Sequence, residues 1–115
     1  MPFRRCASRL GLSLLLLGAC SDLTYVGRAQ TAYEQGRYLE VAESLSRREP
    51  ELDRLPKSQR ARYGLYRGLA LIQLGDPEAG RRWLHYARDL ELSEATLSEP
   101  QRQQLSAGLS GLNAP

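Results

Sequence analysis

Few side chains in this sequence of 115 residues could do chemistry: two cysteines, one histidine and the carboxylates. The histidine, His85, shares the charged face of a predicted helix with Arg82 and Asp89, so a solvated surface residue is expected there. A general base or a metal site needs polar groups that converge, and no Asp, Glu or His cluster has ligand spacing. No glycine-rich phosphate loop follows a strand. We therefore expect that the protein is not an enzyme and uses no cofactor and no metal ion.

The second cysteine, Cys20, ends a segment with the pattern of a secretory signal. Three arginines lie among the first nine residues, and no acidic residue precedes Asp22. The apolar run from Leu10 to Ala19 would make a helix of about 15 Å, which is too short to cross about 30 Å of hydrocarbon. Residues 1–19 are therefore expected to be a signal peptide that is removed. Cys20 would then be the single cysteine of the mature chain.

The residues Leu17-Gly18-Ala19-Cys20 resemble the lipobox of bacterial lipoproteins. The resemblance implies that the lipoprotein signal peptidase cleaves before Cys20 and that the Cys20 thiol carries a diacylglycerol. Lipidation would also consume a thiol that lacks a disulfide partner in an oxidising compartment. Two or three acyl chains give stable membrane anchoring, whereas one chain gives only marginal binding. The alternative is an ordinary signal peptide with a chance cysteine after an Ala-x-Ala-like cleavage site.

The residues after Cys20 bear on localisation. In the lipoprotein family, Asp directly after the cysteine tends to retain the protein in the inner membrane. Here that position is Ser21, and Asp22 follows one residue later. The resemblance thus implies a lipidated N-terminus at residues 20–21 and a protein that faces the periplasm from the bacterial cell envelope. The outer membrane is favoured over the inner membrane.

The charge of the body of the chain, from Asp22 onward, argues against nucleic acid as a partner. Three of the 16 Lys and Arg residues precede Asp22, so 13 basic side chains remain against 13 acidic ones from Asp22 onward. The basic isoelectric point therefore belongs to the N-terminal segment, and the body has no basic footprint for nucleic acid. Arg81, Arg82, His85 and Arg88 could form a small basic patch for lipid phosphates or an acidic partner. Neighbouring carboxylates dilute that patch, so a solvated helix face is the default.

Apolar spacing in the body is helical throughout, and no stretch alternates as a strand would. Gly36 and Gly75 are placed to end helices, Asp76 is placed to cap one, and Ser98 and Gln101 have the spacing of a capping box. The prediction is an all-α fold with helices at about 22–35, 38–49, 58–74, 77–91 and 99–112, and with a connector at residues 51–55.

The two glycine turns lie 39 residues apart, and each joins two predicted helices into an antiparallel hairpin. In the second hairpin Gly68, Gly80 and Ala87 stand at the spacing of the tetratricopeptide repeat, and the chain resembles that family. The resemblance implies one domain at residues 22–112, with two tetratricopeptide-like repeats and a C-terminal capping helix.

The first copy departs from the repeat, because Val41 stands where the second copy has Gly80, so its helices should pack less closely. The alternative fold is an unrelated bundle of α-hairpins. Two repeats are fewer than normally stabilise such an array. The capping helix could supply the missing stability, and so could a homodimer.

In the tetratricopeptide family the first helix of each repeat lines the concave face. The match of this sequence to the repeat therefore implies a partner groove with mostly apolar and aromatic residues. Such a groove favours an apolar helix or strand as its ligand. The alternative is that these residues form core. The groove residues are Gln30, Tyr33, Arg62, Leu65, Tyr66 and Leu69.

These features predict a membrane-anchored helical-repeat adaptor that holds an unidentified envelope protein in an envelope assembly, as pilotins and assembly lipoproteins do. One alternative is a regulatory or inhibitory accessory subunit of an envelope enzyme. The other is a purely structural lipoprotein that coats the membrane.

Overall fold

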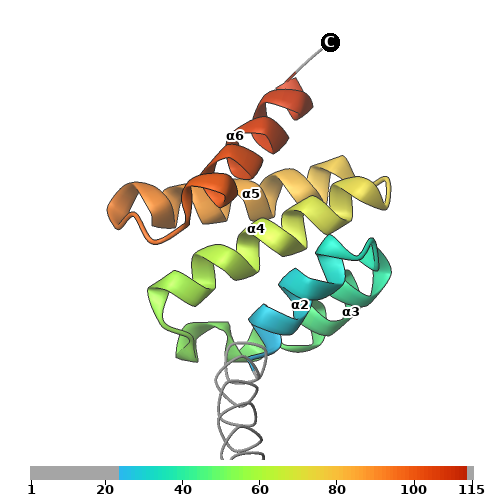
Figure 1. Ribbon diagram of the computed structural model, residues 1–115, viewed down its shortest axis with the longest axis horizontal. Coiled ribbons are helices and arrows are strands. Elements are labelled where there is room, and N and C mark those ends of the chain that lie inside the picture. Colours follow the sequence, from blue (N-terminus) through green and yellow to red (C-terminus); the bar gives the residue numbers. More distant parts are fainter. Residues whose placement is uncertain (1–23, 114–115) are drawn as a thin grey trace, which may run out of the picture.

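The computed structural model describes residues 24–113, and within that range it is all helical, which confirms the expected all-α class (Figure 1). None of the helices in this range is long and apolar enough to cross a bilayer. The predicted signal peptide at residues 1–19, the lipidated N-terminus at residues 20–21 and the start of the predicted helix 22–35 lie outside the described residues. The elements are α2 (Tyr25–Glu34), α3 (Tyr38–Arg47), η1 (Glu49–Arg54), α4 (Lys57–Gln73), α5 (Pro77–Ser93) and α6 (Glu99–Asn113).

Three helix boundaries differ from the prediction by two residues or more. Helix α5 ends at Ser93 rather than at residue 91, and local chemistry explains the other two differences. Helix α2 begins at Tyr25, because the Thr24 hydroxyl oxygen accepts a hydrogen bond from the backbone N–H of Gly27 at 2.9 Å and so caps the helix. Helix α3 ends at Arg47 rather than at residue 49. Pro50 has no N–H to donate, and it lies in the first turn of the 3₁₀ helix η1 that takes the place of the predicted connector.

The other end signals are confirmed. Gly36 and Gly75 have φ angles of 79° and 87°, a backbone conformation that costs glycine little. Asp76 caps α5 by accepting from the N–H of Ala79 at 3.3 Å. Ser98 and Gln101 form the predicted capping box, since each side-chain oxygen accepts from the other residue's backbone N–H, at 3.3 and 3.0 Å. These four signals determine where α2, α4, α5 and α6 begin or end.

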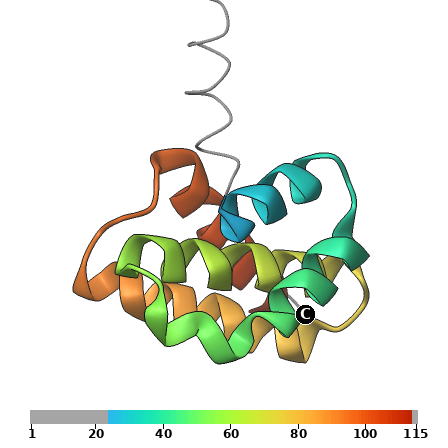
Figure 2. The same cartoon turned by 90° about the horizontal axis from the view of Figure 1, so that it is seen from below.

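The helices form two antiparallel hairpins, α2–α3 and α4–α5, followed by α6. Each helix packs on its neighbour in the chain, and α4 also contacts α2 and α6. Figure 2 shows α2 and the start of α6 on the same side of α4, the start of α6 at the left of the view and α2 at the right. Helices α2, α4 and α6 therefore share one face of the molecule, which is where the predicted groove would lie.

Small residues bring α4 and α5 together, as the sequence predicts. A Cβ atom added to Gly68 would lie 2.8 Å from Leu84 Cδ2, and one added to Gly80 would lie 2.8 Å from the carbonyl oxygen of Gly68. Gly64, which the sequence analysis did not single out, is equally crowded by the carbonyl oxygen of Trp83 at 2.9 Å. The α4–α5 hairpin has the most extensive contact of any helix pair here, whereas α2 and α3 share less contact.

Tyr63 connects α4 to α3 at the centre of the core. Its side chain is fully buried, and its hydroxyl donates a hydrogen bond to the carbonyl oxygen of Leu45. Its ring packs edge-on to Trp83, with 5.3 Å between centroids. The buried core consists of Val26, Ala29, Ala32, Val41, Leu45, Ala61, Tyr63, Leu65, Tyr66, Leu69, Ala70, Leu84, Ala87, Leu97 and Leu105.

The burial of Tyr63 should make the protein unfold more easily at alkaline pH. Burial raises the pKa of Tyr63 from 10.0 to about 12, although the nearby Arg67 opposes the rise. Between these two pH values the unfolded chain has lost the phenolic proton while the folded chain keeps it. The free energy of unfolding should therefore fall by up to about 3 kcal/mol as the pH rises through this window. Below pH 10 the phenol is protonated in both states, so Tyr63 should cause no change of stability with pH there. Urea titrations at a series of pH values measure it.

Tyr63→Phe is the matched variant for this prediction. It should be less stable by about 1 kcal/mol at neutral pH, because the carbonyl oxygen of Leu45 loses its donor. Its stability should also decline less steeply above pH 10. Parallel curves for the variant and the native protein would show that Tyr63 does not cause the alkaline loss.

Candidate functional site

A cleft of about 580 Å³ lies between α2, α4 and the N-terminal half of α6, and we call it the α2–α6 cleft. Its lining residues place it on the face that α2, α4 and α6 share. Its lining comes from three elements that are distant in the sequence, so only the packing of the hairpins assembles it. The lining residues are Gln30, Glu34, Tyr66, Ser98, Pro100, Gln101, Gln103, Gln104 and Ala107.

The loop between α5 and α6 holds one wall of the cleft in place. The Glu91 carboxylate accepts hydrogen bonds from the backbone N–H groups of Thr96 and Leu97, at 2.8 and 2.9 Å. The Gln101 side-chain amide, one turn into α6, donates to the Tyr66 hydroxyl at 3.2 Å. Helix α6 is thus attached to both α5 and α4 by side-chain hydrogen bonds close to the cleft.

The opposite wall is joined to α4 by a polar pair. A terminal nitrogen of Arg62 donates to the Gln30 side-chain oxygen at 2.6 Å. The Tyr33 and Tyr66 rings pack in a tilted arrangement with centroids 5.6 Å apart. The Nε of Arg62 is buried and finds no hydrogen-bond acceptor among residues 24–113.

The two tyrosines remain neutral hydroxyl groups at physiological pH. Burial raises the pKa of Tyr66, against the opposing hydrogen bond from Gln101. Burial also raises the pKa of Tyr33. Neither phenol therefore supplies a base near pH 7, and both can take part in hydrogen bonds as neutral groups.

The cleft surface is rich in primary amides, which both donate and accept hydrogen bonds. Gln30, Gln101, Gln103 and Gln104 each carry two N–H donors and one carbonyl acceptor. A peptide group offers the same pair of functions, so this lining is suited to the backbone of an extended polypeptide. Glu34 is the single carboxylate in the lining.

The structure places the six predicted groove residues in three environments. Gln30 and Tyr66 line the cleft, and Tyr33 and Arg62 contact these two residues from behind. Leu65 and Leu69 are core residues, with 0% and 8% of their surface exposed. The lining is therefore more polar than the sequence analysis expects, because the apolar groove residues turn inward.

The α6 side of the cleft was missed. Gln101, Gln103, Gln104 and Ala107 belong to the helix that the sequence analysis treated only as a cap. The available signal was the glutamine-rich segment 101–104, which is too polar for a helix that only covers a core. Helix α6 contacts α4, as α2 does, and its N-terminal half lines the cleft opposite α2.

His85 on α5 is half-buried, although full solvation was expected. Across residues 24–113, no group of three or more His, Cys, Asp or Glu side chains could hold a metal ion. Comparison with family models, curated proteins and solved structures finds no match to this chain. The α2–α6 cleft is lined from α2, α4 and α6 by mostly polar side chains, and it is the candidate binding site.

Proposed function

We propose that this protein is a non-enzymatic bacterial lipoprotein that binds an extended segment of a partner protein in an envelope assembly. The observation that carries the binding function is the amide-lined α2–α6 cleft on the face shared by α2, α4 and α6. The two hairpins would then be tetratricopeptide-like repeats, and α6 would complete their concave face.

The fit between cleft and ligand rests on hydrogen bonding. An extended peptide has an N–H and a C=O group at each residue, and each of them must be satisfied when it leaves water. The amides of Gln103 and Gln104 lie on α6, and that of Gln30 lies across the cleft on α2. A segment between these walls could pair with both sides, while Glu34 would favour a segment without acidic side chains.

The membrane part of the proposal rests on the sequence Leu17-Gly18-Ala19-Cys20. Acylation at Cys20 would tether the helical domain to the periplasmic face of a membrane, with the outer membrane favoured. The anchor would restrict the search for a partner to the envelope, which raises the effective concentration of two proteins held at the same surface.

Site-specific photocrosslinking in cells tests this function. A photoreactive amino acid replaces Gln104 in the cleft, and a matched variant carries it at the exposed Arg82 on α5. The Gln104 position should give a crosslink to an envelope protein, and mass spectrometry should place that crosslink in an extended segment. The Arg82 position should give none, because it lies outside the cleft.

The variant Gln103→Ala shows whether the cleft side chains cause the binding. Gln103 is exposed at the cleft surface, so the fold should persist, and the crosslink should weaken about fivefold, since a lost hydrogen bond contributes about 1 kcal/mol. Substitution of Tyr66 or Leu69 would instead remove core. A crosslink to a cell-wall hydrolase would favour a regulatory subunit, and contacts between copies alone would favour a structural lipoprotein.

A further inference from the structure

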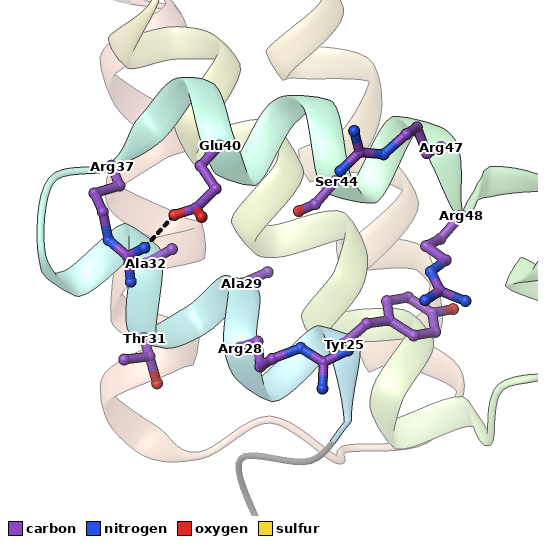
Figure 3. A pocket seen from close by; sticks show the side chains of 10 residues that line it. All are labelled: Tyr25, Arg28, Ala29, Thr31, Ala32, Arg37, Glu40, Ser44, Arg47 and Arg48. Carbon is purple, nitrogen blue, oxygen red and sulfur yellow. Dashed lines mark hydrogen bonds and ion pairs between the residues drawn. The ribbon is translucent and has the colours of Figure 1, made fainter.

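A second recess, of about 420 Å³, lies between α2 and α3 on the first hairpin, and we call it the arginine pocket. Figure 3 shows its side chains around the two helices, with Ala29 and Ala32 of α2 between them. The two alanines are small and buried, so the longer side chains that surround them leave a depression. The residues around it are Tyr25, Arg28, Thr31, Arg37, Glu40, Ser44, Arg47 and Arg48.

The arginine pocket concentrates positive charge on a nearly neutral domain. Four arginines and one glutamate line it, which gives a formal charge of +3. Residues 24–113 as a whole carry 13 basic and 12 acidic side chains, a formal charge of +1. The net positive charge of the pocket lining is therefore larger than that of the whole described domain.

Two of these arginines gather at one end of the hairpin. Because α2 and α3 are antiparallel, the start of α2 lies beside the end of α3, and Figure 3 shows Arg28 and Arg48 near Tyr25, with the Arg47 side chain beside Ser44. The Arg48 guanidinium lies 5.1 Å from the Tyr25 ring centroid and also pairs with Glu51 at 3.1 Å. Arg37 lies at the other end, where it pairs with Glu40. The crowded end is the one at which the chain enters α2.

Chain length places this end close to Cys20. Tyr25 follows Cys20 by five residues, and a fully extended chain covers at most about 3.6 Å per residue, or about 18 Å in total. An acyl anchor at Cys20 would thus hold Tyr25, at this end of the hairpin, within about 18 Å of the anchored residue. Basic side chains that come within about one Debye length, about 8 Å, of anionic lipid are attracted to it.

We propose that the arginine pocket binds the phosphate groups of anionic lipid headgroups and so fixes the orientation of the domain on the membrane. The inference rests on the proposed function, because the anchor at Cys20 supplies the proximity. Guanidinium groups recognise phosphate oxygens with two parallel hydrogen bonds, which suits a site built from arginine.

Arginine modification in reconstituted vesicles tests the pocket. The acylated full-length mature protein, with its lipid verified by intact mass, is placed in phosphatidylcholine vesicles with or without phosphatidylglycerol. Phenylglyoxal, which reacts with arginine side chains, is added, and peptide mass spectrometry gives the rate at each arginine. The rates at Arg28 and Arg47 should fall about fivefold with phosphatidylglycerol, the ratio that corresponds to about 1 kcal/mol per basic side chain near an anionic surface.

Arg82 and Arg88 on α5 are controls within the same molecule, and their rates should not change. The variant Arg28→Gln with Arg47→Gln should lose the protection of Arg48, whereas Arg82→Gln with Arg88→Gln should keep it. Equal rates in the two vesicle types, or an equal fall at Arg82, would overturn the pocket but leave the anchor intact. So would protection by inorganic phosphate that phosphatidylglycerol does not reproduce. A chain without acyl groups would overturn both the anchor and this inference.

Discussion

Gly80→Ala should destabilise the protein by about 1–3 kcal/mol. The added Cβ would lie 2.6 Å from Ile72 Cγ1 and 2.8 Å from the carbonyl oxygen of Gly68. The side chain of Ile72 can rotate, but the Gly68 oxygen belongs to the backbone of α4 and moves only if the two helices separate. Separation of α4 and α5 would also loosen the contacts of Leu84, which is fully buried between them. Urea denaturation, followed through the fluorescence of Trp83, measures the loss.

Gly111→Ala is the matched control, because it makes the same chemical change in another helix. A Cβ at Gly111 would have no atom within 4 Å. Alanine is the better helix former, so this variant should be more stable by about 0.5–1 kcal/mol. The same gain acts at Gly80 but is smaller than the steric cost. If both variants were stabilised equally, the close α4–α5 approach would be wrong.

The sequence predicted the helices and their turns well because those signals are local. A glycine with positive φ, an N-cap and a capping box each depend on a few neighbouring residues, so Gly36, Gly75, Asp76 and Ser98 could be read directly. The same is true of the close-packed hairpin, since Gly68 and Gly80 occur at a spacing that matters only if two helices touch. Thr24 was overlooked because the apolar pattern alone extended the first helix past its cap.

The candidate site was less predictable because it is made by packing between distant segments. Gln30 and Tyr66 of the predicted groove line the cleft, but the repeat spacing in the sequence could not say which neighbouring side chains turn inward. Leu69 is buried, and a Cβ added to Gly108 of α6 would lie 3.2 Å from it, so the C-terminal helix covers part of the expected groove. That contact depends on where α6 packs, which the loop anchored by Glu91 decides.

The arginine pocket illustrates the same limit. Arg28 on α2 precedes the Arg47-Arg48 pair at the end of α3 by 19 residues, so the three arginines form no single basic run in the sequence. They come together only because the Gly36 turn makes α2 and α3 antiparallel. The sequence analysis instead noted the α5 arginines, which are neighbours along one helix but are diluted by carboxylates.

Cys20→Ser should abolish acylation and weaken the partition of the protein into membranes. Each buried methylene contributes about 0.8 kcal/mol, so the loss of two or three acyl chains removes far more binding energy than the arginine pocket could replace. The native chain should have the mass of residues 20–115 plus the acyl groups. The Cys20→Ser chain should carry no acyl mass and keep residues 1–19, because the peptidase reads the cysteine. Intact mass spectrometry and detergent-phase partition measure the two effects.

Cys6→Ser is the matched control for Cys20→Ser, since it replaces the other cysteine of the chain by the same residue. Cys6 lies in the predicted signal peptide, so its replacement should leave the mature mass, the acylation and the membrane partition unchanged. If the Cys20→Ser protein partitioned into the detergent phase as fully as the Cys6→Ser protein, the lipid anchor would be wrong. The approach of the arginine pocket to a bilayer would then lose its physical cause, whereas peptide binding in the α2–α6 cleft would stand, because it depends on the folded helices alone.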